Sequence, residues 1–185
     1  MGDLIDEISM GPFGSDVKVE YFTETGIPIL NGSNITGFVL NDNNLHFMDE
    51  ACVRTMKKAV ARRGDVIITH RGTLGQVVYV PDNSKYSEYL ISQSQFRVRF
   101  KSAVLPEYVV YYLHSRGGQA ELLSNASQVG VPSLARPTST FKNLRIPVPE
   151  LKIQKGIVKV ISDIQDKIII NQAINDNLGG ACFAA

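Results

Sequence analysis

The stretch LKIQKGIVKVISDIQDKIIINQAINDNL, residues 151–178, decides the architecture of this chain. Isoleucines recur in it at alternating spacings of four and three residues, which is the spacing of a heptad seam. The stretch therefore predicts a helix with one narrow apolar stripe directed at a partner helix. Continuing the register adds two asparagines, which cost stability on a seam but fix its register and partner number. The predicted dimerisation seam consists of Ile157, Ile161, Ile164, Ile168, Asn171, Asn175 and Leu178.

Both ends of the helix carry signals. Pro149 is tolerated in a first helical turn, and Glu150 suits the positive N-terminal end of the helix dipole. The glycine pair that begins at Gly179 is a stop signal. We therefore expect a helix over residues 148–178 and a disordered tail over residues 179–185. The quoted stretch would be about 42 Å long at about 1.5 Å per residue.

Periodicity alone leaves two arrangements open, a helix packed back on its own domain and a helix that projects towards another chain. Further apolar residues lie off the seam, and a helix that is apolar on two sides needs more than one neighbour. This favours the projecting helix. The additional apolar residues are Ile153, Val158, Val160, Ile169, Ile170 and Ile174.

Length and composition indicate one soluble domain with an appendage. The chain has 185 residues, of which 44% are hydrophobic and 20% are charged, which is typical of a globular protein. It lacks the apolar run of about eighteen residues that a membrane helix needs, and its acidic N-terminus is unlike a signal peptide. Two distant cysteines, Cys52 and Cys182, predict neither a metal site nor a disulfide framework. We expect a cytoplasmic protein.

The net charge of +1 conceals a strong asymmetry along the chain. Residues 1–50 hold nine acidic residues and one basic residue, whereas residues 51–150 hold fourteen basic and six acidic residues. A middle segment this basic could face a polyanion such as a nucleic acid. The alternative is an ordinary surface whose charges balance once the chain is folded.

Local patterns predict mixed secondary structure. Residues 66–69 and 76–80 indicate two strands joined by the loop HRGTLG, and residues 89–100 contain an alternating strand. Helical spacing is found over residues 48–62 and residues 106–126. Because strands and helices do not alternate regularly, the predicted fold class is α+β.

The motifs of common catalytic sites are missing from the sequence. It contains no phosphate-binding glycine loop, HExxH, GxSxG or CxxC motif. We also find no carboxylates spaced for metal-dependent hydrolysis. We therefore predict no catalytic residue and no metal site, and a small stand-alone hydrolase is disfavoured.

The polar loops instead carry residues suited to DNA. Gly72 and Gly75 would let the loop backbone approach a phosphate closely, and Arg71 could grip a phosphate or a guanine. Gln93 and Gln95 are spaced to share one strand face, and glutamine suits adenine. The alternative for each residue is a turn residue that bonds its own backbone. The predicted DNA-binding residues are Ser15, Lys18, Asn31, Ser33, Asn34, Thr69, Arg71, Thr73, Gln76, Gln93, Gln95, Ser133 and Arg136.

These segments together resemble a known family. The element from Gly64 to Gly75 and the IPVP entry to the helix are its more specific parts. The chain resembles a specificity subunit of a type I restriction-modification system, in a half-length form. The resembling segments, in order, are GDLIDEISMGPFGSDVK, GIPILNGSNI, GDVIITHRGTLGQVVYV, ISQSQFRVR and FKNLRIPVPELKIQKGIVKVISDIQDKIIINQAINDNL.

The resemblance implies a globular target-recognition domain over residues 1–147 and a long C-terminal coiled-coil helix, residues 148–178, for spacing and dimerisation. Full-length members carry two such units, each reading one half of a split DNA target. This chain has one, so we expect a homodimer on double-stranded DNA. We expect the departing tail, GGACFAA, to lie outside the resemblance.

The resemblance also assigns the chemistry to other subunits. A methyltransferase (modification) subunit and a restriction/translocase subunit would use S-adenosylmethionine, ATP and Mg. This chain would bind no cofactor and would not be an enzyme. The alternative is a coiled-coil adaptor that binds protein and no DNA, which explains the helix but not the basic middle segment.

Overall fold

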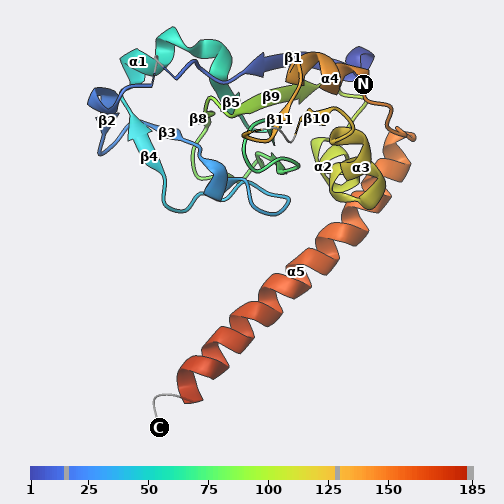
Figure 1. Ribbon diagram of the computed structural model, residues 1–185. Helices are drawn as coiled ribbons and strands as arrows, with labels where there is room; N and C mark the ends of the chain where they lie inside the picture. The colour runs from blue at the N-terminus through green and yellow to red at the C-terminus, as the bar shows by residue number, and fades with distance from the viewer. Residues whose placement is uncertain (15–16, 128–129, 183–185) are drawn as a thin grey trace.

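The computed structural model describes residues 1–14, 17–127 and 130–182, of which Val19 and residues 176–182 are described by their backbone alone. The N-terminal part is a globule of mixed strands and helices, and a single long helix leaves it (Figure 1). The predicted α+β class is confirmed.

Strands of the described residues form a four-stranded antiparallel sheet in the order β1-β9-β6-β7 and a five-stranded sheet in the order β2-β4-β3-β8-β5. In the second sheet β3 and β8 run parallel. The strands of the first sheet are β1 (Ile5–Met10), β9 (Gln95–Phe100), β6 (Val66–Thr69) and β7 (Val77–Tyr79). Those of the second are β2 (Phe22–Thr23), β4 (His46–Met48), β3 (Ile27–Ile29), β8 (Glu88–Leu90) and β5 (Val60–Arg62), and a separate pair is formed by β10 (Ala126–Ser127) and β11 (Ser133–Leu134).

The predicted hairpin is confirmed as β6 and β7, which pair antiparallel. Both faces of this hairpin are buried, which explains its nearly continuous apolar sequence. Val66 and Ile68 face one core together with Phe96. Ile67 and Val78 face a second core on the other side. The first sheet therefore separates two apolar cores.

Helices cover one side of the first sheet and the second sheet packs towards the other. The first core is completed by Val109, Val110 and Leu113 of α2 and by Phe141 of α4. The second core includes Ile29 of β3, Val60 and Ala61 of β5, and Tyr89 and Leu90 of β8. The helices are α1 (Glu50–Thr55), α2 (Pro106–His114), α3 (Arg116–Leu122), α4 (Pro137–Asn143) and α5 (Leu151–Cys182), and the short 3-10 turns are η1 (Gly2–Leu4), η2 (Val19–Tyr21), η3 (Gly32–Asn34) and η4 (Lys57–Ala59).

The helix predicted over residues 48–62 is wrong in its second half. Asp49 caps α1, which ends at Thr55, and the chain then turns through η4 into β5. The reason is tertiary: Val60 pairs with Leu90 in the second sheet, and strand pairing overrides the local helical spacing. The break places the η4 lysines on a turn.

Gln154 fastens the base of α5 to the globule. Its side chain is completely buried. Its Oε1 accepts from the Leu105 backbone N–H at 2.9 Å, and its Nε2 donates to the carbonyls of Ala103 at 3.1 Å and Pro149 at 2.7 Å. The next turns of α5 lie along α2. There the Tyr111 hydroxyl donates to Gln165 Oε1 at 3.1 Å. The direction in which α5 leaves the globule is therefore fixed by buried hydrogen bonds.

Beyond that contact α5 projects away from the globule, and its C-terminal end lies far from the sheets (Figure 1). Only one side of its base is half-buried, at Val158, Ile161, Ser162 and Gln165. The helix is thus not folded back along its whole length. No helix in the described part of the chain combines the length and the apolar character needed to span a bilayer.

The predicted stop at Gly179 and the disordered tail are corrected in part. α5 continues through the glycine pair to Cys182, and residues 183–185 lie outside the described residues. A glycine inside a helix costs only about 1 kcal/mol relative to alanine. It favours a helix end where the backbone turns left-handed after the last helical residue.

Candidate nucleic-acid interface

The loop between β6 and β7 is held by two neighbouring segments. The His70 backbone N–H donates to the Ser94 carbonyl at 2.9 Å, and the His70 carbonyl accepts from the Leu134 N–H at 2.9 Å. Gly72 N–H donates to the Pro132 carbonyl at 2.9 Å, so this amide already has a partner within the protein. The Arg71 side chain remains exposed. The loop therefore presents Arg71 from a fixed backbone.

The turn at residues 31–34 lies against the same loop. Gln76 Nε2 donates to the Gly32 carbonyl at 3.4 Å, and Gln95 Nε2 donates to the Asn31 carbonyl at 3.4 Å. Asn31 Oδ1 accepts from the Ser33 N–H at 2.8 Å and thereby caps η3. The fold thus brings together the predicted residues of the 31–34, 69–76 and 93–95 segments.

Three of the predicted DNA contacts are buried inside the protein. Asn34 is fully buried and donates to the carbonyls of Asn41 and Asn43, both at 2.9 Å. Thr69 is 4% exposed and bonds Gln76 Oε1 at 3.2 Å. Gln95 is 1% exposed. These residues shape the loops and do not face a ligand, because their polar groups are satisfied by backbone or neighbouring side chains.

The predicted common face of Gln93 and Gln95 is wrong. Gln95 begins β9, whereas Gln93 lies in the turn before it and is exposed. The Gln95 Oε1 accepts from the Ser92 N–H at 2.9 Å, which folds that side chain back over the turn. Strand alternation does not apply to residues outside a strand.

The remaining predicted residues do not all lie at this loop cluster. Ser133 pairs with Arg71 in a backbone bridge, and Thr73 is exposed on the loop. Arg136 is exposed at the start of α4 with a left-handed backbone, φ 46°. Lys18 belongs to a different hollow, where its ammonium lies 3.4 Å from Glu20. Ser15 lies outside the described residues.

A cavity of about 750 Å³ adjoins the loop, and we call it the basic groove. Its walls are residues 9–14, residues 54–59, the pair His70 and Arg71, and Gln93. The walls come from the end of β1, from α1 and η4, and from the β6–β7 loop. The groove therefore forms where these segments meet the turn that carries Gln93, so its walls come from four parts of the sequence.

The groove is strongly cationic. Four basic side chains line it, those of Arg54, Lys57, Lys58 and Arg71, and none of its described lining residues is acidic. Arg54 also pairs with Glu50 at 3.4 Å on the exposed side of α1. Burial lowers the pKa of His70, so its imidazole adds no full charge at neutral pH. Such a surface attracts polyanions.

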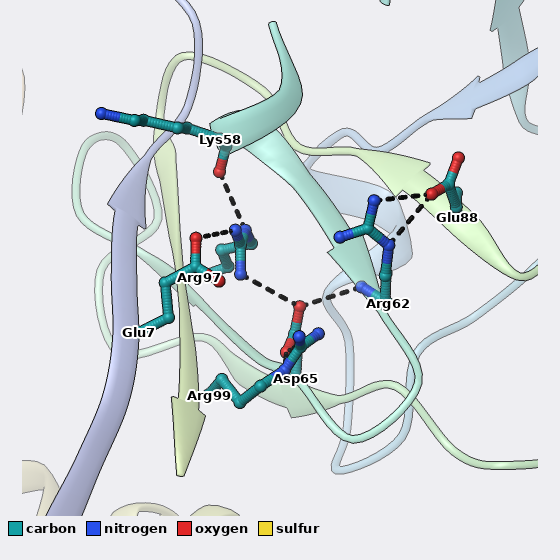
Figure 2. A network of polar contacts seen from close by, with 7 residues as sticks. All are labelled: Glu7, Lys58, Arg62, Asp65, Glu88, Arg97 and Arg99. Atoms are coloured by element: carbon teal, nitrogen blue, oxygen red, sulfur yellow. Dashed lines mark hydrogen bonds and ion pairs between the residues drawn. The ribbon is translucent and has the colours of Figure 1, made fainter. Parts of the chain in front are cut away.

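A buried arginine supports the lysine wall of the groove. The Arg97 side chain is 1% exposed, and its Nε donates to the Lys58 carbonyl at 2.8 Å. Figure 2 shows the Lys58 carbonyl directed at Arg97 while the lysine side chain extends away from it. The backbone of the η4 turn is therefore held by Arg97, while the side chains of Lys57 and Lys58 line the groove.

Arg97 in turn belongs to a polar network that links β1, β9 and the residue preceding β6 (Figure 2). Its guanidinium contacts Glu7 at 2.5 Å and the fully buried Asp65 at 3.4 Å, and Arg99 contacts Asp65 at 2.8 Å. The hydrogen bond from Arg97 lowers the pKa of Glu7. Desolvation raises the pKa of Asp65, against the opposing effect of the Arg62 N–H and both arginines. The network carries buried charge and therefore depends on all its members.

Sequence reasoning missed Arg54, Lys57, Lys58 and Phe13 as individual residues. The basic excess of residues 51–150 was the available signal, but it did not show which cations would converge. Within the described residues, no group of three or more histidine, cysteine, aspartate or glutamate side chains is placed to hold a metal ion.

Comparison with known protein families gives one match over most of the chain. Residues 21–179 match the model described as "Type I restriction modification DNA specificity domain". No curated protein sequence matches significantly.

Several solved structures have a similar fold. One chain comes from a structure that describes complex assembly and conformational transition of the type I R-M system. It has a TM-score of 0.67 and 20% identity, over 91% of this chain and 38% of that one. The HsdS subunit of Thermoanaerobacter tengcongensis has a TM-score of 0.59 and 21% identity, over 91% and 37%. The type I restriction-modification S subunit of M. genitalium has a TM-score of 0.59 and 16% identity, over 89% and 37%. The chain thus spans less than two-fifths of the length of these structures.

Proposed function

Because this chain belongs to the family of type I restriction-modification DNA specificity domains, we propose that it binds double-stranded DNA through the basic groove and reads a short sequence there. The observation that carries the proposal is the convergence of Arg54, Lys57, Lys58 and Arg71 around one groove with no described acidic lining residue. Phosphate contacts from such cations position a protein on the duplex, and contacts to base edges supply specificity.

Arg71 is the proposed base reader. It is exposed at the groove, and its backbone is held by the pairing with Ser133. A guanidinium can bond the O6 and N7 of guanine in the major groove with two parallel hydrogen bonds. The neighbouring Thr73 and Gln93 are exposed and supply further polar groups at the same end of the first sheet.

We further propose that the chain reads one half of a split target and pairs with a second copy through α5. Ile157, Ile164 and Ile168 of the seam are 37%, 53% and 51% exposed, respectively. Ile161 is half-buried on the side facing its own globule, Asn171 and Asn175 are exposed, and the Leu178 side chain lies outside the described residues. A two-fold pair would cover the exposed isoleucines with the same surface of a second copy.

In an antiparallel pair, α5 would act as a ruler. Its 32 residues correspond to about 48 Å at about 1.5 Å per residue, or about fourteen base pairs at about 3.4 Å each. The buried hydrogen bonds of Gln154 support this role, because a ruler must meet its recognition domain at a fixed angle.

The proposed role in the cell is that of a non-catalytic, cytoplasmic subunit that supplies the DNA sequence specificity. The chain would direct a methyltransferase subunit and a restriction subunit to the target. Methyl transfer from S-adenosylmethionine and ATP- and Mg-dependent cleavage would belong to those subunits, so we expect no turnover by the isolated chain.

Arg71→Ala tests the reading of DNA. The probes are duplexes that the wild-type chain selects from a random pool. If Arg71 bonds a guanine, we expect the variant to lose about 1–3 kcal/mol of binding free energy, and only on the selected sequence. Fluorescence anisotropy at several salt concentrations measures it. Arg145→Ala, an exposed arginine outside the groove, is the control and should bind as the wild type does.

Two other results have distinct meanings. A loss that is equal for all sequences, with a salt dependence shallower by about 0.9, assigns Arg71 to a phosphate. Unchanged binding makes Arg71 a structural residue of the loop. Failure of the wild-type chain to retain any duplex from the pool would favour the protein-binding adaptor instead.

Deletion of Ile168–Ile174 tests the ruler. Removing one heptad preserves the seam register and shortens α5 by about 10 Å, so the gap between half-sites should shrink by about three base pairs. Methylome sequencing of a host that carries the chain with its methyltransferase measures the gap. Lys159→Ala/Asp163→Ala, which breaks an exposed pair at 3.0 Å on the same helix, should leave the gap unchanged. An unaltered gap in the deletion variant rules the ruler out.

A further inference from the structure

Phe13 stands out on the rim of the basic groove. Its side chain is 82% exposed, although the preceding Pro12 is buried. Scattered exposed apolar residues are ordinary, but this ring lies beside a cluster of cations that already fits a nucleic acid. Given the DNA binding proposed above, on which this inference rests, we propose that the Phe13 ring inserts between two base pairs of the bound duplex and partly unstacks them.

The segment that carries Phe13 is fixed on its N-terminal side. The Gly11 N–H donates to the Gln95 carbonyl at 2.9 Å. A Cβ on Gly11 would lie 1.9 Å from the Ser92 carbonyl oxygen, so only glycine allows this close approach. On the other side, Gly14 lies against Gln93, where a Cβ would be 2.5 Å from Oε1. The ring is therefore presented from a backbone that is packed against the turn preceding β9.

The surroundings of the ring favour a nucleic acid over a protein partner. Lys57, Lys58 and Arg71 line the same groove and would grip the phosphates on either side of the opened step. Met10, 37% exposed, adds apolar surface at the same rim. An apolar side chain between base steps gains stacking contact with both neighbours, and the cost of unstacking is offset by the closer fit of the bent duplex.

The experiment uses the full chain and a short duplex selected by it from a random pool, with 2-aminopurine placed in turn at each adenine. For the wild type we expect increased fluorescence at one step, because unstacking relieves quenching of 2-aminopurine. Phe13→Ala should abolish the increase and weaken binding about tenfold, with an unchanged salt slope because the ring contacts no phosphate. Phe13→Leu should keep part of both effects. Phe22→Ala, a second exposed phenylalanine outside the groove, should behave as the wild type does.

The possible failures can be told apart. If Phe13→Ala binds with wild-type affinity and wild-type fluorescence, the inference is wrong while the proposed DNA binding stands. If Phe13→Ala binds DNA normally but loses the methyltransferase subunit in a pull-down, the ring serves a protein partner and the inference is equally overturned. If the wild-type chain binds no duplex, the proposed function itself fails. Circular dichroism of each variant confirms that it is folded.

Discussion

Arg97→Ala is expected to lower the free energy of unfolding by about 3–5 kcal/mol, the range found when one member of a buried ion pair is removed. Arg97 is among the largest fully buried side chains, so its loss also leaves a cavity. Asp65, which has no exposed surface, would keep only Arg99 and the Arg62 N–H, and the Lys58 carbonyl would lose its donor. A buried charge with fewer partners is costly because water cannot replace them.

Urea unfolding followed by circular dichroism measures the change. Arg54→Ala is the matched control, because its pair with Glu50 is exposed on both sides and exposed pairs contribute about 0–1 kcal/mol. A loss below about 1 kcal/mol for Arg97→Ala would mean that water enters the site and solvates Asp65.

Lys57→Glu/Lys58→Glu is expected to weaken DNA binding on the order of 100-fold at physiological salt. Two cations that would release counterions are replaced by two charges that repel phosphate. The plot of the logarithm of affinity against the logarithm of salt concentration should become shallower by about 2, at about 0.9 per lost phosphate contact. Anisotropy titrations with pooled random duplexes suffice, because phosphate contacts do not depend on sequence.

The control for this variant carries the same change of net charge in another place. Lys101 follows the far end of β9, and Lys142 lies in α4; neither lines the groove. Lys101→Glu/Lys142→Glu should therefore lose much less affinity. Equal losses in both variants would show that binding responds to the net charge of the molecule and not to the groove.

The elements that could be predicted from the sequence are those whose signal is local. β6 and β7 are short apolar runs, β9 alternates, and α5 has the heptad spacing of its isoleucines. In each case the side chains that form the pattern also decide the structure. The helix over residues 48–62 failed because the pairing of Val60 with Leu90 involves a strand some thirty residues away.

Polar loop residues could be located but not assigned a role. Asn34 and Gln95 have the same hydrogen-bonding groups whether they face a base or a backbone carbonyl. Gln95 bonds the Ser92 N–H because the turn places that amide 2.9 Å away, and no sequence pattern specifies such a distance. Arg71 was predicted as a DNA contact, and its side chain is exposed at the groove.

The basic groove itself could not be derived from the sequence. Its walls meet because β1, β9 and β6 are neighbours in one sheet. The Gly11 N–H then reaches Gln95, and the His70 N–H reaches Ser94. On a continuous helix, Arg54, Lys57 and Lys58 would have formed an ordinary solvated face. The turn at η4 makes them one side of a hollow.

The two cores described above share the β6–β7 hairpin as a common wall, with Val66 and Ile68 facing one and Ile67 and Val78 facing the other. Looser packing in one core would therefore also weaken the packing of the other core against the hairpin. Because the hairpin is packed on both faces, the loops at its end are held rigidly. A bound duplex would therefore meet a surface whose shape is set before contact. Adapting to a new target would then require exchange of side chains on a constant frame, because the frame cannot bend towards a different sequence without loosening both cores.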